Sequence, residues 1–149
     1  MAHARIANKV QAPLIEKGKA DVLVGFEMLE TARALCMLKQ QGSVVLNTKY
    51  IPPNLSVTSG SKLPSYDKLR EMIKKNAGRV CEIDAIKIAE ELGNLLVVNT
   101  ILLGALSALP ENPITKGSYE EAISGRFKEK LVKINLQAFE SGRKAVAIG

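Results

Sequence analysis

The chain contains an almost unbroken apolar run, Ala20-Asp21-Val22-Leu23-Val24-Gly25-Phe26, which follows a polar turn. The run lacks the alternation of apolar and polar residues typical of a half-exposed strand, so it predicts a strand buried on both faces. A helical pattern follows over 27–39, and Val44-Val45-Leu46 predicts the next buried strand, which ends at Asn47-Thr48. A strand, a helix and a strand in this order indicate a βαβ unit with a parallel strand pair.

The segments on either side of this unit extend the same architecture. Residues 5–15 predict two short strands around a turn at Asn8-Lys9, and Pro13 predicts that the second strand is short or at an edge. Glycine and serine are frequent over 54–62, which predicts a loop. The spacing of apolar residues predicts one more strand over 80–83 and helices over 65–76, 85–92, 95–109, 119–127 and 131–146.

The expected fold class is therefore α/β, with a mixed, largely parallel sheet, flanking helices and a helical C-terminal half. No repeat or second domain is visible, so residues 1–149 are expected to form one domain. The stretch 92–110 is uncharged, but glycine and polar residues interrupt it. It predicts a helix buried against other elements rather than a membrane span.

The composition argues against several classes of function. The sequence contains two cysteines, Cys36 and Cys81, so it cannot supply a four-cysteine iron–sulfur or zinc site by itself. Its one histidine, His3, lies near a terminus, which disfavours a catalytic pair of histidine with serine or cysteine. Aromatic residues make up 4% and tryptophan is absent, so stacking of single-stranded bases is not expected. The first residues, Met-Ala-His-Ala-Arg, do not form the apolar segment of a secretory signal. A cytoplasmic setting with reduced thiols is therefore expected.

The net charge of +6 comes entirely from the first half of the chain. Residues 1–75 carry 12 Lys and Arg against 6 Asp and Glu, whereas residues 76–149 carry 9 of each kind. A basic surface can bind nucleic acid, an anionic membrane, an acidic protein or a phosphorylated ligand. A solvated basic face is an equally good interpretation, and the absence of a run of five basic residues disfavours a nucleic-acid-binding tail.

Candidate binding residues lie where the strands are predicted to end. No Gly-x-Gly pair occurs, so the sequence has neither a dinucleotide fingerprint nor a P-loop. Open α/β sheets bind ligands beyond the carboxyl ends of their strands, which makes Gly25, Phe26, Asn47 and Thr48 the candidates here. Asparagine and threonine at strand ends also cap neighbouring loops, and this structural interpretation stays open. Ser59-Gly60-Ser61-Lys62 is a weaker candidate for binding a phosphate through backbone N–H groups.

Asn99 is a further candidate because it interrupts an apolar helical stretch. A buried amide without a partner costs about 1–3 kcal/mol, so its side chain is expected to bond a loop backbone, a ligand or a partner chain. No spacing of acidic residues, histidine or cysteine in the sequence indicates a catalytic or metal site.

An ordered series of motifs resembles a known family. The motifs lie at 20–27, 30–33, 42–53, 99–106 and 135–142. Together they resemble the gamma-type domain of the 2-oxoacid:ferredoxin oxidoreductases, and the segments 64–85 and 89–94 favour the small (beta) subunits of the indolepyruvate:ferredoxin oxidoreductases. Members of this family usually begin with a glycine-rich strand–turn–helix that this sequence lacks, so the domain is expected to be truncated at its N-terminus.

The resemblance implies a fold like domain III of pyruvate:ferredoxin oxidoreductase and a role as a non-catalytic subunit. The whole enzyme would decarboxylate a 2-oxoacid oxidatively, here an indolepyruvate or another aryl pyruvate. It would join the acyl group to coenzyme A and pass electrons to ferredoxin. Thiamine diphosphate and iron–sulfur clusters would lie on the catalytic partner subunit and not on this chain. Coenzyme A is the one cofactor that this chain could help to bind, through basic residues such as Lys49 and Lys62.

Other interpretations stay open. The chain could be the gamma subunit of a pyruvate or ketoisovalerate oxidoreductase, or a stand-alone α/β module that binds an anionic small molecule at its strand ends. Nucleic-acid binding rests on charge alone, and neither nucleic acid nor a membrane is expected as a partner. The subunit interpretation predicts an exposed apolar surface on the helices after residue 85, which would also suit a homo-oligomer.

Overall fold

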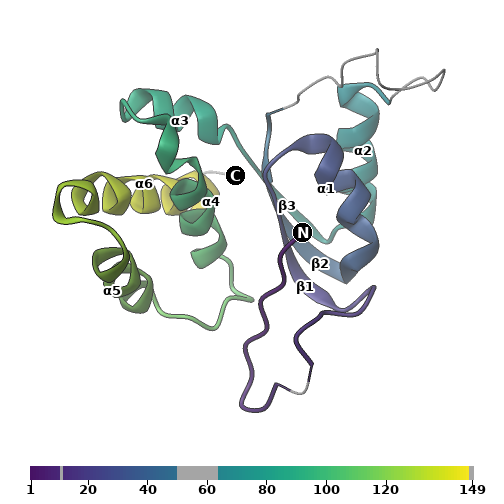
Figure 1. The fold of residues 1–149 in the computed structure, drawn as a ribbon. Helices are drawn as coiled ribbons and strands as arrows, with labels where there is room; N and C mark the ends of the chain where they lie inside the picture. The colour runs from purple at the N-terminus through teal and green to yellow at the C-terminus, as the bar shows by residue number, and fades with distance from the viewer. Residues whose placement is uncertain (11, 50–63, 148–149) are drawn as a thin grey trace.

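A computed structural model describes residues 1–10, 12–49 and 64–147. In chain order its elements are β1 (Ala20–Gly25), α1 (Met28–Ala34), η1 (Leu35–Met37), β2 (Leu38–Asn47), α2 (Tyr66–Asn76), β3 (Arg79–Ile83), α3 (Ala85–Glu91), η2 (Leu95–Val97), α4 (Val98–Ser107), α5 (Lys116–Arg126) and α6 (Glu129–Ala147). The strands form a parallel sheet in the order β1-β2-β3. α1 and α2 cover one face of this sheet, and α4 and α6 cover the other (Figure 1). The predicted α/β class is confirmed.

The middle strand, β2, divides the apolar core into two halves. Val44, Val45 and Leu46 are fully buried, as the sequence predicted. Because side chains alternate along a strand, Val44 and Leu46 face α1 and α2, while Val45 faces the α4 and α6 side. The first half contains Met28, Leu69 and Ile73, and the second contains Ile83, Ile101 and Leu102.

Side chains at the helix starts explain why three helices begin where they do. Ser65 accepts a hydrogen bond from the N–H of Lys68 at the start of α2, and Asp84 accepts one from Lys87 at the start of α3. Such caps stabilise a helix by about 1 kcal/mol each. α5 begins three residues before the predicted start because Thr115 caps it.

The crossing of α4 and α6 depends on two glycines. A Cβ atom built on Gly104 would lie 2.0 Å from the carbonyl oxygen of Phe139, and one on Gly142 would lie 1.8 Å from that of Ile101. The two backbones therefore touch directly, which only residues without a Cβ allow. This close contact explains both glycines as packing residues.

The first helix is shorter, and the second strand longer, than the sequence pattern predicted. Of the helix expected over 27–39, only α1 is formed, and it ends at Ala34. After one turn of η1 the chain enters β2, where Leu38 pairs with Ala20 in the parallel register. Lys39 consequently lies in β2 and not at the end of a helix. Its ammonium group forms an ion pair with the carboxylate of Asp21 on β1.

The N-terminal part of the sheet also differs from the expectation. The two strands predicted over 5–15 are not formed in residues 5–10 and 12–15, where the Arg5 guanidinium instead donates to the carbonyl of Ala12 at 2.7 Å. The described sheet is accordingly parallel throughout. Within it β1 is an edge strand whose side chains pack on both faces, Val22 and Val24 against the α4 and α6 side and Leu23 against the α1 and α2 side, and these three residues are half-buried rather than fully buried. The apolar spacing of the helix over 65–76 also predicts that Leu69, Met72 and Ile73 face the core; Leu69 and Ile73 do, but Met72 is 42% exposed.

Candidate functional site

The four candidate residues at the strand ends lie together at the carboxyl edge of the sheet. Gly25 ends β1, Asn47 ends β2, and Phe26 and Thr48 follow them directly. The backbone N–H of Thr48 donates to the carbonyl of Ile83 at 2.9 Å, which holds the ends of β2 and β3 side by side. The sequence therefore predicted correctly which residues share this edge.

Asn47 is a structural link between the three strand ends. Its side chain is 1% exposed, its Nδ2 donates to the carbonyl of Phe26 at 3.1 Å, and its Oδ1 accepts from the N–H of Ala85 at 3.2 Å. The amide thus joins the chain after β1 to the first residue of α3. For Asn47, the structure therefore agrees with the interpretation that asparagine at a strand end caps neighbouring loops.

Gly25 is explained by the packing of α1 and not by space for a ligand. A Cβ at this position would lie 1.9 Å from the Thr31 hydroxyl, which is buried and donates to the carbonyl of Glu27 at 2.6 Å. Three of the described residues that follow the strands at this edge are exposed: Phe26, at 52%, Lys49, and Asp84 after β3. An exposed aromatic ring and a cation can contact a ligand that has an apolar and an anionic part. The candidate phosphate-binding segment 59–62 lies outside the described residues.

Asn99 lies elsewhere and is not buried. It is exposed on α4, so the argument from a buried amide does not apply to it. The buried polar pair of this helix is formed by the next residue, Thr100, whose hydroxyl donates to Oδ1 of Asn135 on α6 at 2.7 Å. The sequence placed both residues in predicted helices, but only their packing across the α4–α6 crossing shows that they are partners.

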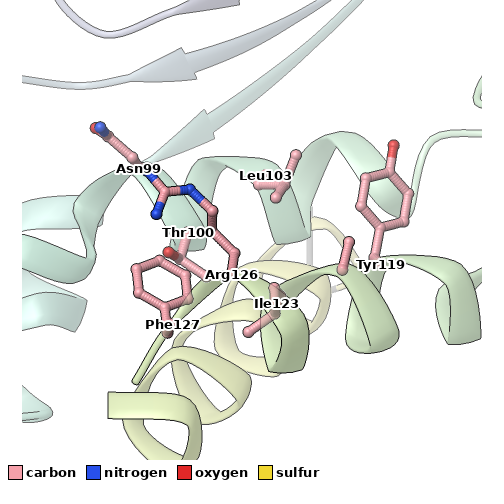
Figure 2. Close-up of a pocket in the computed structure, with 8 residues that line it drawn as sticks. Asn99, Thr100, Leu103, Tyr119, Ile123, Arg126 and Phe127 are labelled. Carbon is pink, nitrogen blue, oxygen red and sulfur yellow. The ribbon is translucent and has the colours of Figure 1, made fainter. Parts of the chain in front are cut away.

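Asn99 lines a groove between α4 and α5 that the sequence did not reveal. The groove has a volume of about 520 Å³ (Figure 2). Its apolar walls belong to the core cluster of Tyr119, Ile123 and Phe139, against which Leu103 and Phe127 pack. Asn99 and Arg126 lie at one end of the groove, and the hydroxyl of Tyr119 lies at the other. The lining residues are Asn99, Thr100, Leu103, Tyr119, Ala122, Ile123, Arg126 and Phe127.

Three carboxylates, those of Glu82, Glu111 and Glu140, have lowered pKa values for structural reasons, and for Glu140 on α6 the cause is the Lys116 ammonium group at 2.8 Å. On β3, two hydrogen bonds from the Arg70 guanidinium of α2, one of 2.6 Å to Oε1 and one of 2.5 Å to Oε2, hold the pKa of Glu82 below its ordinary value. A hydrogen bond of 2.6 Å from the buried Ser43 hydroxyl lowers the pKa of Glu111 in the same way. Burial raises the pKa of the Cys81 thiol. The three carboxylates link separate segments of the fold and do not form a catalytic cluster.

Two observations concern metals and membranes. In residues 1–10, 12–49 and 64–147, no three side chains of histidine, cysteine, aspartate or glutamate are grouped so that they could hold a metal ion. Among the helices that the structure describes, none has the length and apolar character needed to cross a bilayer.

Comparison with known proteins shows that the chain has close relatives over nearly its whole length. It is 34% identical over 147 residues to indolepyruvate oxidoreductase subunit IorB of Thermococcus kodakarensis, covering 97% of this chain and 72% of that protein. It is 39% identical over 142 residues to the IorB subunit of Archaeoglobus fulgidus, covering 94% of this chain and 69% of that one.

The fold is shared with a solved gamma subunit. The structure is similar, with a TM-score of 0.63, to the gamma subunit of the keto/oxoacid ferredoxin oxidoreductase from Geobacter sulfurreducens. The two sequences are 21% identical, and the match covers 87% of this chain and 65% of that one. Residues 1–145 also match the family model described as pyruvate ferredoxin/flavodoxin oxidoreductase. The chain therefore belongs to the pyruvate ferredoxin/flavodoxin oxidoreductase family.

Proposed function

We propose that this chain is the small, non-catalytic subunit of a 2-oxoacid:ferredoxin oxidoreductase that acts on indolepyruvate or a related aryl pyruvate. The observation that carries the proposal is the identity of 34% and 39% to two IorB subunits over at least 94% of the chain. The complete enzyme would decarboxylate the 2-oxoacid oxidatively, transfer the acyl group to coenzyme A and reduce ferredoxin. Residues 1–149 would act in it as one gamma-type domain, in the cytoplasm.

The side chains of this chain support a catalytic centre on another subunit. An iron–sulfur cluster needs several thiolates close together, but the two cysteines are single residues, Cys36 at the surface on η1 and Cys81 half-buried on β3. The carboxylates with lowered pKa values already bind groups within the fold: Glu82 binds Arg70, Glu111 binds Ser43, and Glu140 binds Lys116. Thiamine diphosphate and the clusters would accordingly lie on the catalytic partner subunit, against which this chain packs.

We also propose that the carboxyl edge of the sheet contributes to coenzyme A binding in the assembled enzyme. Phe26 and Lys49 are exposed there and Thr48 is half-buried, so all three can reach a ligand. The ammonium group of Lys49 suits a coenzyme A phosphate. Gly25 and Asn47 would shape this edge without touching the ligand. The side chain of Thr31 fills the space beside Gly25, and both polar atoms of the Asn47 amide are already hydrogen-bonded within the fold.

Anaerobic co-purification tests the subunit proposal. The tagged chain is isolated from its source cells, and the proteins present in equal amount are identified by mass spectrometry. We expect a larger subunit that contains thiamine diphosphate and iron–sulfur clusters, and a complex that reduces ferredoxin faster with indolepyruvate than with pyruvate. A chain that purifies alone as a monomer would refute the subunit role, and a preference for pyruvate would refute the substrate.

Kinetics of the same complex test the coenzyme A proposal. Replacing Lys49 together with Lys62 by alanine should raise the KM for coenzyme A and leave the KM for the 2-oxoacid unchanged. The matched control is Lys133→Ala, which removes one exposed ammonium group from α6. An unchanged KM for coenzyme A in the double variant would rule out this contribution while leaving the subunit role intact.

A further inference from the structure

We propose that the groove between α4 and α5 receives a segment of the catalytic subunit that carries an apolar side chain next to a carboxylate. The inference rests on the proposed function, because it requires such a subunit. Its structural basis is the apolar groove together with two polar side chains, those of Asn99 and Arg126, that lie at one end of it (Figure 2).

The polar groups of the groove fall into two kinds. Thr100 donates to Asn135, and the hydroxyl of Tyr119 donates to Oδ1 of Asn112 at 3.0 Å, so these two are satisfied within the fold. Asn99 and Arg126 have no hydrogen-bond or ion-pair partner in the part of the chain that the structure describes. The free donors therefore gather at one end of the groove, and the remaining lining is apolar.

The unpaired guanidinium indicates the charge of the occupant. Lys116, at the other end of α5, forms ion pairs with Glu120 and Glu140, whereas no described acidic side chain reaches Arg126. A guanidinium binds a carboxylate through two parallel hydrogen bonds, and the Asn99 amide can donate a third. A phosphorylated ligand such as coenzyme A carries several phosphates and would need more cations than this single one.

The apolar surface continues beyond the groove, which indicates a polypeptide rather than a small molecule. Leu96 is 90% exposed on η2, three residues before Asn99. Residues three and seven positions apart lie along one side of a helix, so Leu96, Asn99 and Leu103 form a single strip. Large exposed apolar side chains next to a groove are typical of protein interfaces. An inserted side chain would pack against Ile123 and Phe127 and bring its neighbouring carboxylate to Arg126.

Photo-cross-linking in the co-purified complex tests the position. A p-benzoylphenylalanine placed at Ala122, an exposed lining residue, should cross-link to the catalytic subunit at a peptide containing aspartate or glutamate beside an apolar residue. The control places the same group at Ser124, which points away from the groove two residues along α5 and should give no such product. Absence of a cross-link from Ala122 in an intact complex would refute the docking site.

A charge reversal tests the chemistry. Arg126→Glu should raise the dissociation constant between the two subunits about tenfold or more, because it replaces an attraction by a repulsion. Lys128→Glu makes the same change of charge at an exposed residue outside the groove and should alter it less than about threefold. Replacing the cross-linked acid by arginine should restore binding to Arg126→Glu.

The outcomes separate this inference from the proposed function. Equal effects of Arg126→Glu and Lys128→Glu, or a missing rescue, would overturn the docking site while the subunit role stands. If no subunit with thiamine diphosphate and iron–sulfur clusters co-purifies at all, both the proposed function and the docking site are refuted.

Discussion

Replacing Gly142 by alanine should force α4 and α6 apart. The new Cβ would lie 1.8 Å from the carbonyl oxygen of Ile101, whereas carbon and oxygen atoms in contact are about 3.3 Å apart or more. The clash is with the backbone of α4, so no side-chain rotation relieves it. The two helices would have to separate by roughly 1.5 Å, which loosens the buried Thr100–Asn135 pair between them.

The size of the effect follows from two opposing contributions. Overpacking a well-packed core costs about 1–3 kcal/mol and occasionally more, while alanine is favoured over glycine in a helix by up to about 1 kcal/mol. We therefore expect Gly142→Ala to lower the free energy of unfolding by about 1–2 kcal/mol. For a chain of this size that corresponds to a fall in Tm of roughly 2–8 °C.

Urea unfolding followed by circular dichroism measures the change, and α5 supplies a control of opposite sign. A Cβ on Gly125 would meet nothing within 4 Å, so Gly125→Ala should keep or raise stability, by up to about 1 kcal/mol. If Gly142→Ala were as stable as the original chain, with the same dependence on urea, the direct backbone contact between α4 and α6 would be refuted.

Three further changes test other contacts of the structure. Asn47→Ala removes two hydrogen bonds from a buried amide and should lower the free energy of unfolding, measured in urea, by about 2–4 kcal/mol; a loss below about 1 kcal/mol would contradict its linking role. Because the pKa of Glu82 is lowered in the folded state, its carboxylate stabilises the fold above the ordinary pKa, and this contribution is lost as the pH falls through the lowered value. The stability difference between the original chain and Glu82→Gln should therefore be present at pH 7 and disappear in acid, and a gap that is independent of pH would argue against the Arg70 contact. Ser43→Ala should raise the pKa of Glu111 toward its ordinary value in an NMR titration, and an unchanged pKa would exclude the Ser43 hydroxyl as its cause.

Close contacts explain two of the glycines in the motifs that resemble the family. Gly104 and Gly142 lie in the segments 99–106 and 135–142, and both sit where α4 and α6 touch. The α4–α6 pair in turn supports Thr100 and Leu103, which line the groove. The helical half of the chain thus connects its packing residues with the surface proposed to meet the catalytic subunit.

The strand ends show how far sequence reasoning about the site could go. The topology rule for parallel sheets placed Gly25, Phe26, Asn47 and Thr48 at one edge, and the structure brings them together there. It could not distinguish residues that build the edge from residues that face solvent. That distinction depends on neighbours distant in sequence, such as Ala85 for Asn47 and Thr31 for Gly25.

By itself, the sequence determined the elements whose signals are local. The apolar triplet 44–46 predicted the central strand, and apolar spacing predicted helices over 65–76 and 85–92, which the structure shows capped by Ser65 and Asp84, because these signals involve residues within a few positions of each other.

Only the tertiary structure decided which side chains are buried and which are free. Lys39 lies in a strand because its neighbour Leu38 pairs with Ala20 of β1, and Asn99 is exposed because α4 turns Thr100, not Asn99, toward α6. The groove beside Arg126 exists because α5 packs on α6 through Tyr119 and leaves space along α4. Such contacts join residues far apart in the chain, so no pattern within one segment contains them.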